Sequence, residues 1–510
     1  METTNSAVAT EDVMIMQYRL RLPHTEYLVG WILLALILYF SAYSSVSDVP
    51  PSSVPVHHDD YSLYAAAGEP FQLTWIRPLS YFLMSVLSGA GPEWLAWTVR
   101  ALAITYVFLC WVLLQQVTEH KLSRLFMVMY GISIYASPMS VENTRYMGVL
   151  TQLLSGCLGV LSAVIAIKAV KAGKYDQSRT MEVFWLLFSG LCITASTLAK
   201  EGFVLLYAVT IVYAVYRWRP TLRLHLSALS FFSFTSVFLI LAAKILADSS
   251  FLGVKDESST YFVNINPISI LSTAWIYLTG SGHPAMRSSG ICITVLAVFL
   301  IFWTIGRSIR EKRVHSGFYL LAAAFSVMLP YCLLPNHVYP YYEILWLPFI
   351  LAALYAILSE TKVHEPSNKK LVIFAKPSVV IIAVALLFSL AGYKGRQGIA
   401  AWYDRVAEDN LRVFSVIEEN RVRIEQAMNV CVEGANIFSP WYLHGGGYMQ
   451  TVKGIDAKWF VLSNERVPEY AGFKAGSDAS RGRVMLVYDF REAPVNCVKI
   501  NLKPKSGGMS

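Results

Sequence analysis

Long apolar runs, each separated from the next by a short polar segment, extend from near the start of the chain to residue 393. A helix that crosses the hydrocarbon core of a membrane needs about 20 apolar residues. Although some runs are shorter, their number and spacing predict an all-α polytopic membrane protein with eleven spanning helices. The expected spans are Tyr27–Tyr43, Leu95–Val117, Leu122–Pro138, Met147–Val170, Val183–Leu198, Phe203–Tyr216, Leu226–Ala247, Ile291–Ile305, Gly317–Leu334, Ile344–Leu358 and Leu371–Tyr393.

The pattern changes after the last of these runs. The segment Lys394–Ser510 carries charges of both signs and contains a helix-like stretch, Leu411–Met428, and a strand-like stretch, Arg483–Phe490. Their periodicities are those of an amphipathic helix and of a short strand. We therefore predict two domains: a membrane domain, residues 1–393, and a small α+β domain, residues 394–510.

The composition is typical of a membrane protein, and it affects how the net charge should be interpreted. Of the 510 residues, 55% are hydrophobic and 15% are charged, whereas soluble proteins carry about 25% charged residues. The net charge of +8 does not indicate nucleic-acid binding. The basic residues lie in short clusters between apolar runs, as they do in the cytoplasmic loops of membrane proteins.

These basic clusters also predict the orientation of the chain. Each cluster precedes the first expected span or follows an even-numbered one: Arg19 and Arg21; Lys121 and Arg124; Lys168, Lys171, Lys174 and Arg179; Arg217, Arg219 and Arg223; Arg307, Arg310, Lys312 and Arg313; Lys362, Lys369 and Lys370. Because Lys and Arg are retained in cytoplasmic loops, we expect the N-terminus inside and the C-terminus outside. No apolar core precedes residue 25, so the first span is expected to act as an uncleaved signal anchor.

Two of the seven cysteines, Cys431 and Cys497, lie in the polar C-terminal segment. Disulfides persist in oxidising compartments, so this pair can be bonded if the segment faces outward. The other five cysteines lie in apolar runs, where a thiol is most simply a small core residue.

One apolar stretch, Val183–Tyr216, is interrupted only by Lys200 and Glu201. Basic clusters flank the stretch on both sides, so both of its ends should lie inside. The stretch must then cross the membrane twice, with Lys200 and Glu201 at a tight outer turn. The alternative is one long kinked helix, which would invert the side of every later loop.

This topology collects polar side chains from four distant segments at the outer face. They are Asp59, Asp60 and Arg77 from the first outer loop; Glu142, Asn143 and Arg145 from the loop Ser137–Tyr146; Lys200 and Glu201 from the tight turn; and His337, Tyr341, Tyr342 and Glu343 from the loop Pro335–Glu343. Two further outer stretches, Tyr61–Leu87 and Ile268–Leu278, are expected to lie along the interface. Ionisable groups at a membrane edge are costly and mark candidate functional sites.

Carboxylates and isolated cations together suit the transfer of a group from a lipid-linked phosphate. A carboxylate, Asp59 or Asp60, can take the proton of an acceptor hydroxyl as a general base. Arginine and lysine can hold the phosphate of the leaving group and stabilise its growing charge. Simpler roles are open for each residue: Asp60 can cap a helix and Arg77 can snorkel to the interface. Lys200 and Glu201 can pair with each other, and tyrosines can anchor at a membrane edge.

The segment that follows the two carboxylates resembles a known family. Residues 59–83, DDYSLYAAAGEPFQLTWIRPLSYFL, are similar to the DD…W…GRPL pattern of bacterial O-antigen-modifying glucosyltransferases, which belong to the GT-C superfamily of polyprenyl-phosphate-sugar glycosyltransferases. The matching residues are Asp59, Asp60, Trp75, Arg77, Pro78 and Leu79, and Ile76 stands where the pattern often has glycine. An acidic motif in the first outer loop, many spans and a C-terminal outer domain are also typical of this superfamily.

The resemblance implies an inverting glycosyltransferase of the bacterial inner membrane, with Asp59 or Asp60 as the base. The donor would be an undecaprenyl-phosphate or other polyprenyl-phosphate sugar, and the acceptor a cell-surface glycan or a lipid-linked molecule. Some members need a divalent metal held by acidic residues of several outer loops and others do not, so cofactors are left open. Arg77 is one expected substrate-binding residue. The others are expected because the predicted topology places them at the outer face: Glu142, Arg145, Lys200, Glu201, His337, Tyr341, Tyr342 and Glu343.

Two other functions stay open at this point. An O-antigen polymerase or ligase has a similar topology but relies on a large, arginine-rich outer loop, and the outer segment Asp248–Arg287 carries little arginine. A lipid-linked saccharide transporter or flippase usually shows repeated halves and charges deep within its spans, and the sequence shows no repeat. The glycosyltransferase, the polymerase or ligase and the transporter would all contact membrane lipids, and none of them would bind nucleic acid.

Overall fold

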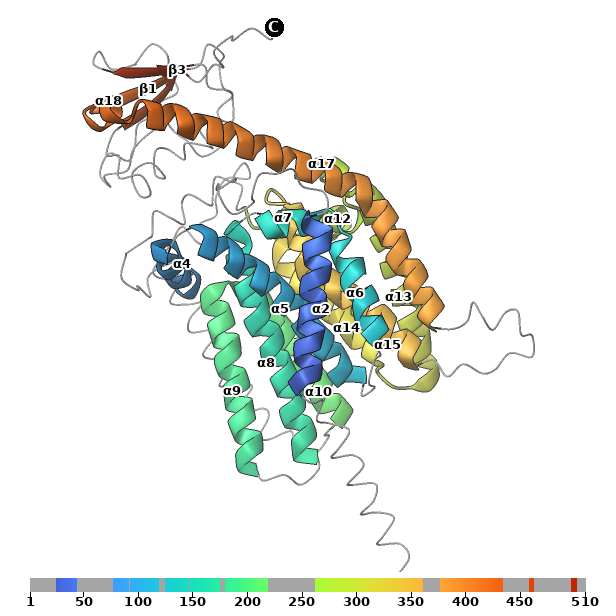
Figure 1. Ribbon diagram of the computed structural model, residues 1–510. Helices are drawn as coiled ribbons and strands as arrows, with labels where there is room; N and C mark the ends of the chain where they lie inside the picture. The colour runs from blue at the N-terminus through green and yellow to red at the C-terminus, as the bar shows by residue number, and fades with distance from the viewer. Residues whose placement is uncertain are drawn as a thin grey trace, which may run out of the picture.

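Helices dominate the computed structural model of the chain (Figure 1). It describes residues 24–43, 77–90, 92–118, 124–145, 147–174, 179–218, 262–360, 377–433, 458–462 and 497–501. The α-helices before the C-terminal part are α2 (His24–Tyr43), α4 (Pro78–Ala90), α5 (Pro92–Thr118), α6 (Arg124–Tyr135), α7 (Met139–Arg145), α8 (Leu150–Lys174), α9 (Arg179–Ala199), α10 (Val204–Trp218), α12 (Pro267–Thr279), α13 (Arg287–Glu311), α14 (Ser316–Cys332), α15 (Glu343–Glu360) and α17 (Pro377–Glu419). Short 3-10 turns are η1 (Met147–Val149), η2 (Glu201–Phe203), η3 (Pro284–Met286) and η4 (Pro340–Tyr342).

Five of the described helices are long and apolar enough to cross a membrane: Trp94–Thr118, Leu150–Lys171, Pro284–Glu311, Glu343–Glu360 and Pro377–Asp404. Helices α2, α6, α9, α10 and α14 are shorter and also apolar. A described helix therefore lies at the place of every span expected from the sequence except Leu226–Ala247, which falls outside the described residues. The protein is mostly helical and has several candidate membrane spans, and the number eleven stays a prediction.

Helices α8 and α9 pack along a seam of serines. The hydroxyl oxygens of Ser155 and Ser196 are 3.0 Å apart, and those of Ser162 and Ser189 are 3.2 Å apart. Small residues let helix backbones approach closely inside membranes, and their hydroxyls can bond across the contact. Because the residue number rises along α8 as it falls along α9, the two helices are antiparallel.

The chain reverses direction at Lys200, as the alternation of basic loops predicts. A Cβ atom on Gly159 of α8 would lie 2.6 Å from that of Phe203, just before α10. Near the other end of α8, the ammonium of Lys171 lies 4.6 Å from the ring centroid of Trp218, the last residue of α10. Helix α10 therefore runs parallel to α8 and antiparallel to α9. The long apolar stretch that contains α9 and α10 is a hairpin and not one kinked helix.

The bundle has two ends, which we name after one residue in each. The Lys200 end holds the turn between α9 and η2, together with η4 and the start of α15. The Glu360 end holds the last turns of α13 and α15, where the guanidinium of Arg307 lies 3.9 Å from the carboxylate of Glu360. Helix α5 ends there too, because Ser316 donates a 3.3 Å hydrogen bond to the carbonyl of Val117. The basic cluster that follows the eighth expected span begins with Arg307 and thus lies at the Glu360 end.

Helix α15 is the most enclosed helix, and every residue from Glu343 to Ile357 is buried. The Tyr130 hydroxyl donates to the Pro348 carbonyl at 3.0 Å, and the Tyr106 hydroxyl donates to the Leu345 carbonyl. Such bonds satisfy both groups without water, as a membrane interior requires. The start of α15, and with it the preceding loop, is therefore held in place from two neighbouring helices.

Helix α17 runs without a break across residue 393, where the composition of the chain changes. A Cβ atom on Gly392 would lie 2.0 Å from the carbonyl oxygen of Ala136, and one on Gly395 would lie 2.2 Å from that of Ala285. The two glycines therefore let α17 rest against the backbone just before α7 and in η3. Figure 1 shows α17 rising along the bundle, bending over the end that carries α7 and α12, and leading to a small sheet.

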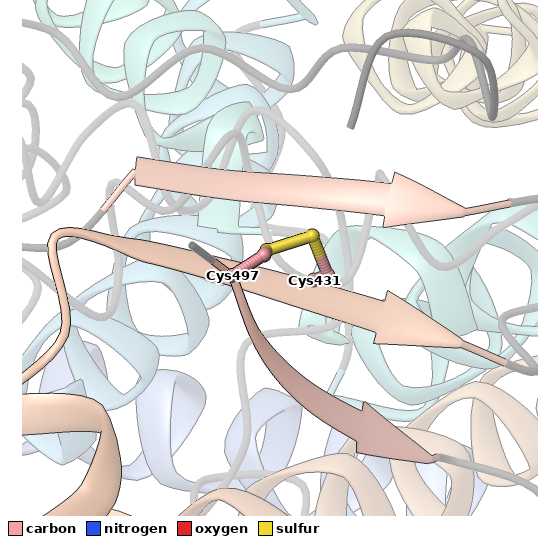
Figure 2. Close-up of a disulfide and its surroundings, with 2 residues drawn as sticks. All are labelled: Cys431 and Cys497. Atoms are coloured by element: carbon pink, nitrogen blue, oxygen red, sulfur yellow. A yellow bond between two sulfur atoms is a disulfide. The ribbon is translucent and has the colours of Figure 1, made fainter. Parts of the chain in front are cut away.

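The sheet has three parallel strands in the order β2–β1–β3. The C-terminal elements are α18 (Arg421–Glu425), β1 (Asn429–Glu433), β2 (Lys458–Leu462) and β3 (Val498–Asn501). Cys431 in β1 and Cys497, just before β3, form a disulfide (Figure 2), so the pairing that the sequence left open is present. The strand expected at Arg483–Phe490 lies outside the described residues, and the α+β domain as a whole stays a prediction.

Helix α12 presents large apolar side chains to its surroundings. Ile268 is 77% exposed, Leu271 70% and Trp275 57%. Asn266 caps the helix by accepting a 3.0 Å hydrogen bond from the amide of Ile268, and Gly280, in the left-handed region with φ 62°, ends it. A short capped helix with an exposed apolar face and a tryptophan suits the interfacial position expected from the sequence.

Candidate functional site

Lys200 interrupts the helical hairpin in an extended conformation, with φ −167° and ψ 146°. Its amide donates to the Ser196 carbonyl at 2.8 Å, and its own carbonyl accepts from the Ser155 hydroxyl at 2.6 Å. The backbone at this turn is thus fixed by the serine seam of α8 and α9. The lysine is only 5% exposed, so its side chain points into the bundle end and not into open water.

An amide, a hydroxyl and two aromatic rings contact the ammonium of Lys200. The amide oxygen of Gln152 accepts from it at 3.0 Å, in the amide orientation that also lets the Gln152 nitrogen donate to the Gly148 carbonyl at 2.9 Å. The Tyr342 hydroxyl lies 3.5 Å from Nζ. Two aromatic rings face the charge, with centroids 5.0 Å away for Tyr342 and 5.5 Å away for Tyr331. Such cation–π contacts stabilise a buried cation.

Tyrosines form one wall of this site. Tyr331 and Tyr342 stack with centroids 4.0 Å apart, and Tyr341 packs against Tyr342 at 4.5 Å. The Tyr341 hydroxyl donates to the Tyr342 hydroxyl at 3.4 Å. A Cβ atom on Gly202 would lie 2.8 Å from the Tyr331 hydroxyl oxygen, so a glycine at this position leaves room for the stacked pair. The wall is therefore built by α14, η4 and the turn after Lys200 together.

His337 contacts Tyr342 of the tyrosine wall. Its Nε2 atom is 3.1 Å from the Tyr342 hydroxyl oxygen, and its backbone carbonyl accepts from the Tyr277 hydroxyl at 3.4 Å. The residue is 8% exposed. His337, Tyr342 and Lys200 thus form one connected chain of polar groups.

Two more of the segments expected outside contact the site around Lys200 and Tyr342. Asn143 of α7 donates to the Tyr341 carbonyl at 3.3 Å, which fixes α7 against η4. Ser80 of α4 donates to the carbonyl of Ala199, directly before Lys200, at 3.0 Å. The structure therefore brings the segments after Arg77, around Asn143, around Lys200 and around Tyr342 together, as the predicted sidedness requires.

Arg77 stands immediately before α4 and is half-buried. Its carbonyl accepts from the amide of Tyr81 at 2.9 Å, so the residue is tied to the first turn of the helix that contacts the Lys200 turn. Arg77 therefore lies at the start of the helix whose Ser80 contacts the Lys200 turn, and its role in the site stays a prediction. The side chain of Arg100, one helix farther on, is 6% exposed and lies 5.0 Å from the Trp97 ring centroid.

Glu343 begins α15 and lines a small pocket. The residue is 2% exposed, and neither carboxylate oxygen has a hydrogen-bond partner among the described residues. It lines a pocket of about 20 Å³ with His283 and Tyr277, which is enough room for one water molecule. Partial burial lowers the pKa of His283, so this histidine is neutral at pH 7. The pocket thus sets a buried carboxyl group beside room for one small polar group.

Several residues expected in the site lie outside what the structure describes. Asp59 and Asp60 belong to this group, as do the side chains of Glu142, Arg145 and Glu201. Their proposed roles therefore rest on the sequence. No three His, Cys, Asp or Glu side chains among the described residues come close enough to share a metal ion, so those residues supply no metal-binding set, and we derive no step through a metal.

Two contributors to the site were not singled out from the sequence. Gln152 and Tyr331 both lie in apolar runs, where a polar or aromatic residue most simply reads as part of the core. A lone amide near the outer end of an expected span is the signal that could have found Gln152. Tyr331 follows Pro330 inside α14, and nothing in its sequence context marks it.

Comparisons with known proteins give only distant structural likenesses. No protein-family model matches the sequence, and no curated protein matches it. Among solved structures, ArnT from Cupriavidus metallidurans bound to undecaprenyl phosphate aligns with a TM-score of 0.45 and 13% identity over 87% of each chain. The oligosaccharyltransferase of Archaeoglobus fulgidus aligns with a TM-score of 0.44 and 11% identity over 84% of this chain and 63% of its own.

Proposed function

We propose that this protein is an integral membrane glycosyltransferase of GT-C type that moves a sugar from a polyprenyl-phosphate carrier to a cell-surface glycan or a lipid-linked acceptor. The observation that carries the proposal is the buried ammonium of Lys200, held at the point where four outer segments meet. Burying a charge at the edge of a membrane costs free energy, so such charges usually mark functional sites.

The surroundings of Lys200 suit a phosphate group. An ammonium is a compact charge that serves phosphates as a point cation, and Arg77 enters the site from the neighbouring loop. Gln152 and the two stacked tyrosines hold the ammonium in position. The apolar helices on all sides provide the surface for a polyprenyl tail.

The reaction then proceeds by one displacement. The acceptor oxygen attacks the anomeric carbon while the bond from that carbon to the phosphate oxygen breaks, which inverts the configuration. The acceptor proton passes to the carboxylate of Asp59 or Asp60. The electron pair of the broken bond stays with the polyprenyl phosphate, whose extra negative charge is stabilised by Lys200 and Arg77.

The remaining site residues take binding roles in this proposal. Glu343 and its water-sized pocket accept one donor group, such as a hydroxyl of the sugar or of the acceptor. Tyr341 supports Tyr342, and Glu142, Arg145 and Glu201 contact the substrates from the outer loops.

The disulfide supports the proposed orientation. Structural disulfides persist outside the cytoplasm, and Cys431–Cys497 lies in the segment that the basic loops predict to be outside. We therefore propose a multi-pass protein of the bacterial inner membrane with a cytoplasmic N-terminus. Its catalytic membrane domain would comprise residues 1–393, and an extracytoplasmic domain residues 394–510.

Binding of undecaprenyl phosphate to the purified full-length protein tests the function. A Lys200→Met variant keeps the length of the side chain and removes the charge. We expect its Kd to rise about ten- to a hundredfold, because a hydrogen bond to a charged group contributes about 1.5–3 kcal/mol.

The matched control is Lys168→Met, in helix α8, which packs against α9. The Lys168 ammonium also faces an aromatic ring, with the Trp185 centroid 4.9 Å away, but it lies toward the opposite end of α8. The control should bind undecaprenyl phosphate as the unmodified protein does. Equal affinity of the Lys200→Met variant and the unmodified protein would refute the proposed phosphate site.

A further inference from the structure

Arg396 of α17 lies at the edge of a helix contact at the Lys200 end. The preceding residue, Gly395, rests against the backbone of Ala285, since a Cβ atom on it would lie 2.2 Å from the Ala285 carbonyl oxygen. Arg396 is half-buried, and its Nε atom has no hydrogen-bond partner among the described residues. A guanidinium stays charged, and a buried N–H group without an acceptor costs free energy. Arg396 is therefore suited to a ligand that brings an anionic oxygen.

The two segments on either side of this contact contribute charges of one sign. Arg287, the first residue of α13, directly follows η3. Residues 262–310 and 377–403 contain no Asp or Glu. A third segment, α7, also packs against α17 and carries Glu142, whose side chain lies outside the described residues. The segments that hold Arg287 and Arg396 therefore supply cations and no acids, so they attract an anion.

Helices α13 and α17 pack against each other (Figure 1) and run in opposite directions. Both expose large apolar side chains: Leu386 and Leu390 in α17, and Ile291 and Val295 in α13. The two leucines precede Arg396, whereas the two α13 residues follow Arg287. On both helices, the cation is thus nearer to the Lys200 end than the apolar side chains are. A membrane lipid has the same order, with its charged headgroup at one end and its apolar chains at the other.

Two aromatic residues of α17 are exposed near Arg396. They are Tyr393 and Trp402. Tyrosine and tryptophan gather at the level of the lipid headgroups, so this part of α17 suits the boundary between membrane and water. A guanidinium there can donate two parallel hydrogen bonds to phosphate oxygens, which an ammonium cannot do.

We propose that Arg396, with Arg287 beside it, binds the phosphate of an anionic membrane phospholipid whose acyl chains lie along α13 and α17. An anionic phospholipid fits better than a zwitterionic one, because a zwitterionic headgroup brings a cation of its own to a basic surface. The bound lipid would join α13 to the helix that leads to the C-terminal sheet. This site is separate from Lys200 and does not depend on the proposed transfer reaction.

Titration of short-chain lipids into the purified full-length protein tests the inference. Dioctanoyl phosphatidylglycerol carries one negative charge, and dioctanoyl phosphatidylcholine has the same chains but no net charge. In a non-ionic detergent, we expect the unmodified protein to bind the phosphatidylglycerol about tenfold more tightly, as a charge-assisted hydrogen bond allows. Equal Kd values for the two lipids would overturn the inference, whether or not any variant folds.

Variants of α17 assign the preference to one residue. Arg396→Gln removes the charge and should raise the Kd for phosphatidylglycerol about tenfold, to the value for phosphatidylcholine. The matched control is Lys394→Gln. Lys394 is exposed, and two residues along a helix point to nearly opposite faces, so this variant should keep the preference. If Arg396 instead forms an ion pair with Glu142, the preference persists in Arg396→Gln, and the inference is wrong.

A last variant separates this site from the proposed donor site. Lys200→Met should bind phosphatidylglycerol as the unmodified protein does, even where it has lost affinity for undecaprenyl phosphate. Loss of the phosphatidylglycerol preference in Lys200→Met but not in Arg396→Gln would place the lipid phosphate at Lys200 and refute a site on α17. Failure of undecaprenyl phosphate to bind at Lys200 would refute the proposed function alone.

Discussion

At the scale of single residues, Lys200 shows how a charge is kept at a membrane edge. Gln152 accepts one of its hydrogens, and two tyrosine rings face its charge. A cation–π contact contributes about 0.5–2 kcal/mol, whereas moving an ion out of water costs several kcal/mol. A phosphate would add an opposite charge beside the ammonium, which is the ligand that we propose for this site.

The proposed base and the proposed phosphate site can be separated by mutation. Asp59→Asn and Asp60→Asn remove a proton acceptor but keep the size of the side chain and leave Lys200 itself in place. We expect both variants to bind undecaprenyl phosphate with nearly unchanged Kd, and at least one to lose sugar transfer, because a positioned general base contributes about 10²–10⁴-fold in rate.

Mass spectrometry of surface glycan from cells that carry each variant measures this transfer. Cells that carry a double variant, with both aspartates replaced by asparagine, should match cells without the gene. Full modification of the glycan by the double variant would reject a carboxylate base in the first outer loop.

The sequence predicted part of the site at this scale. Lys200, His337 and Tyr342 were expected together because basic loops alternate along the chain, and the structure places them in contact. Gln152 and Tyr331 were not expected, since periodicity assigns a polar residue in an apolar run to the core. Only the packing of α8, α14 and η4 turns these two residues toward the lysine.

At the scale of elements, α17 connects the membrane bundle with the C-terminal sheet. Its glycines touch the backbone of Ala136 and Ala285, next to the segments that carry Asn143 and His283. The sequence placed a domain boundary at residue 393 because charged residues become frequent there. Helical periodicity does not stop at a change of composition, and the helix continues to Glu419.

Glycine substitutions along α17 test this contact. Ala in place of Gly stabilises an exposed helix by about 0.5–1 kcal/mol, whereas an atom forced into a packed contact costs about 1–3 kcal/mol. Gly392→Ala and Gly395→Ala should therefore lower the thermal unfolding temperature of the purified protein.

Gly398 provides the matched control, because a Cβ atom there would have no neighbour within 4 Å. Gly398→Ala should leave the unfolding temperature unchanged or raise it. If all three variants have the same effect, α17 does not rest on the backbone of Ala136 and Ala285.

At the scale of the whole molecule, the account depends on the side of the membrane that each loop occupies. The alternation of basic clusters predicts two faces, and this orientation stays a prediction. The Lys200 end gathers the segments expected outside, while Arg307 and the basic residues that follow it lie at the Glu360 end. What the sequence could not predict is the depth and angle of each helix, because these depend on packing and not on hydropathy.

Cysteine labelling is the most direct measurement of this central claim. Asp60→Cys and Glu201→Cys are made separately in the full chain, and a membrane-impermeant maleimide is added to spheroplasts before and after the membrane is opened. Lys312→Cys is the control for the inner face, and the unmodified protein shows the background from its own cysteines. We predict that positions 60 and 201 react before opening and position 312 only afterwards. Reaction of positions 60 and 201 from opposite sides of the membrane would contradict a shared site.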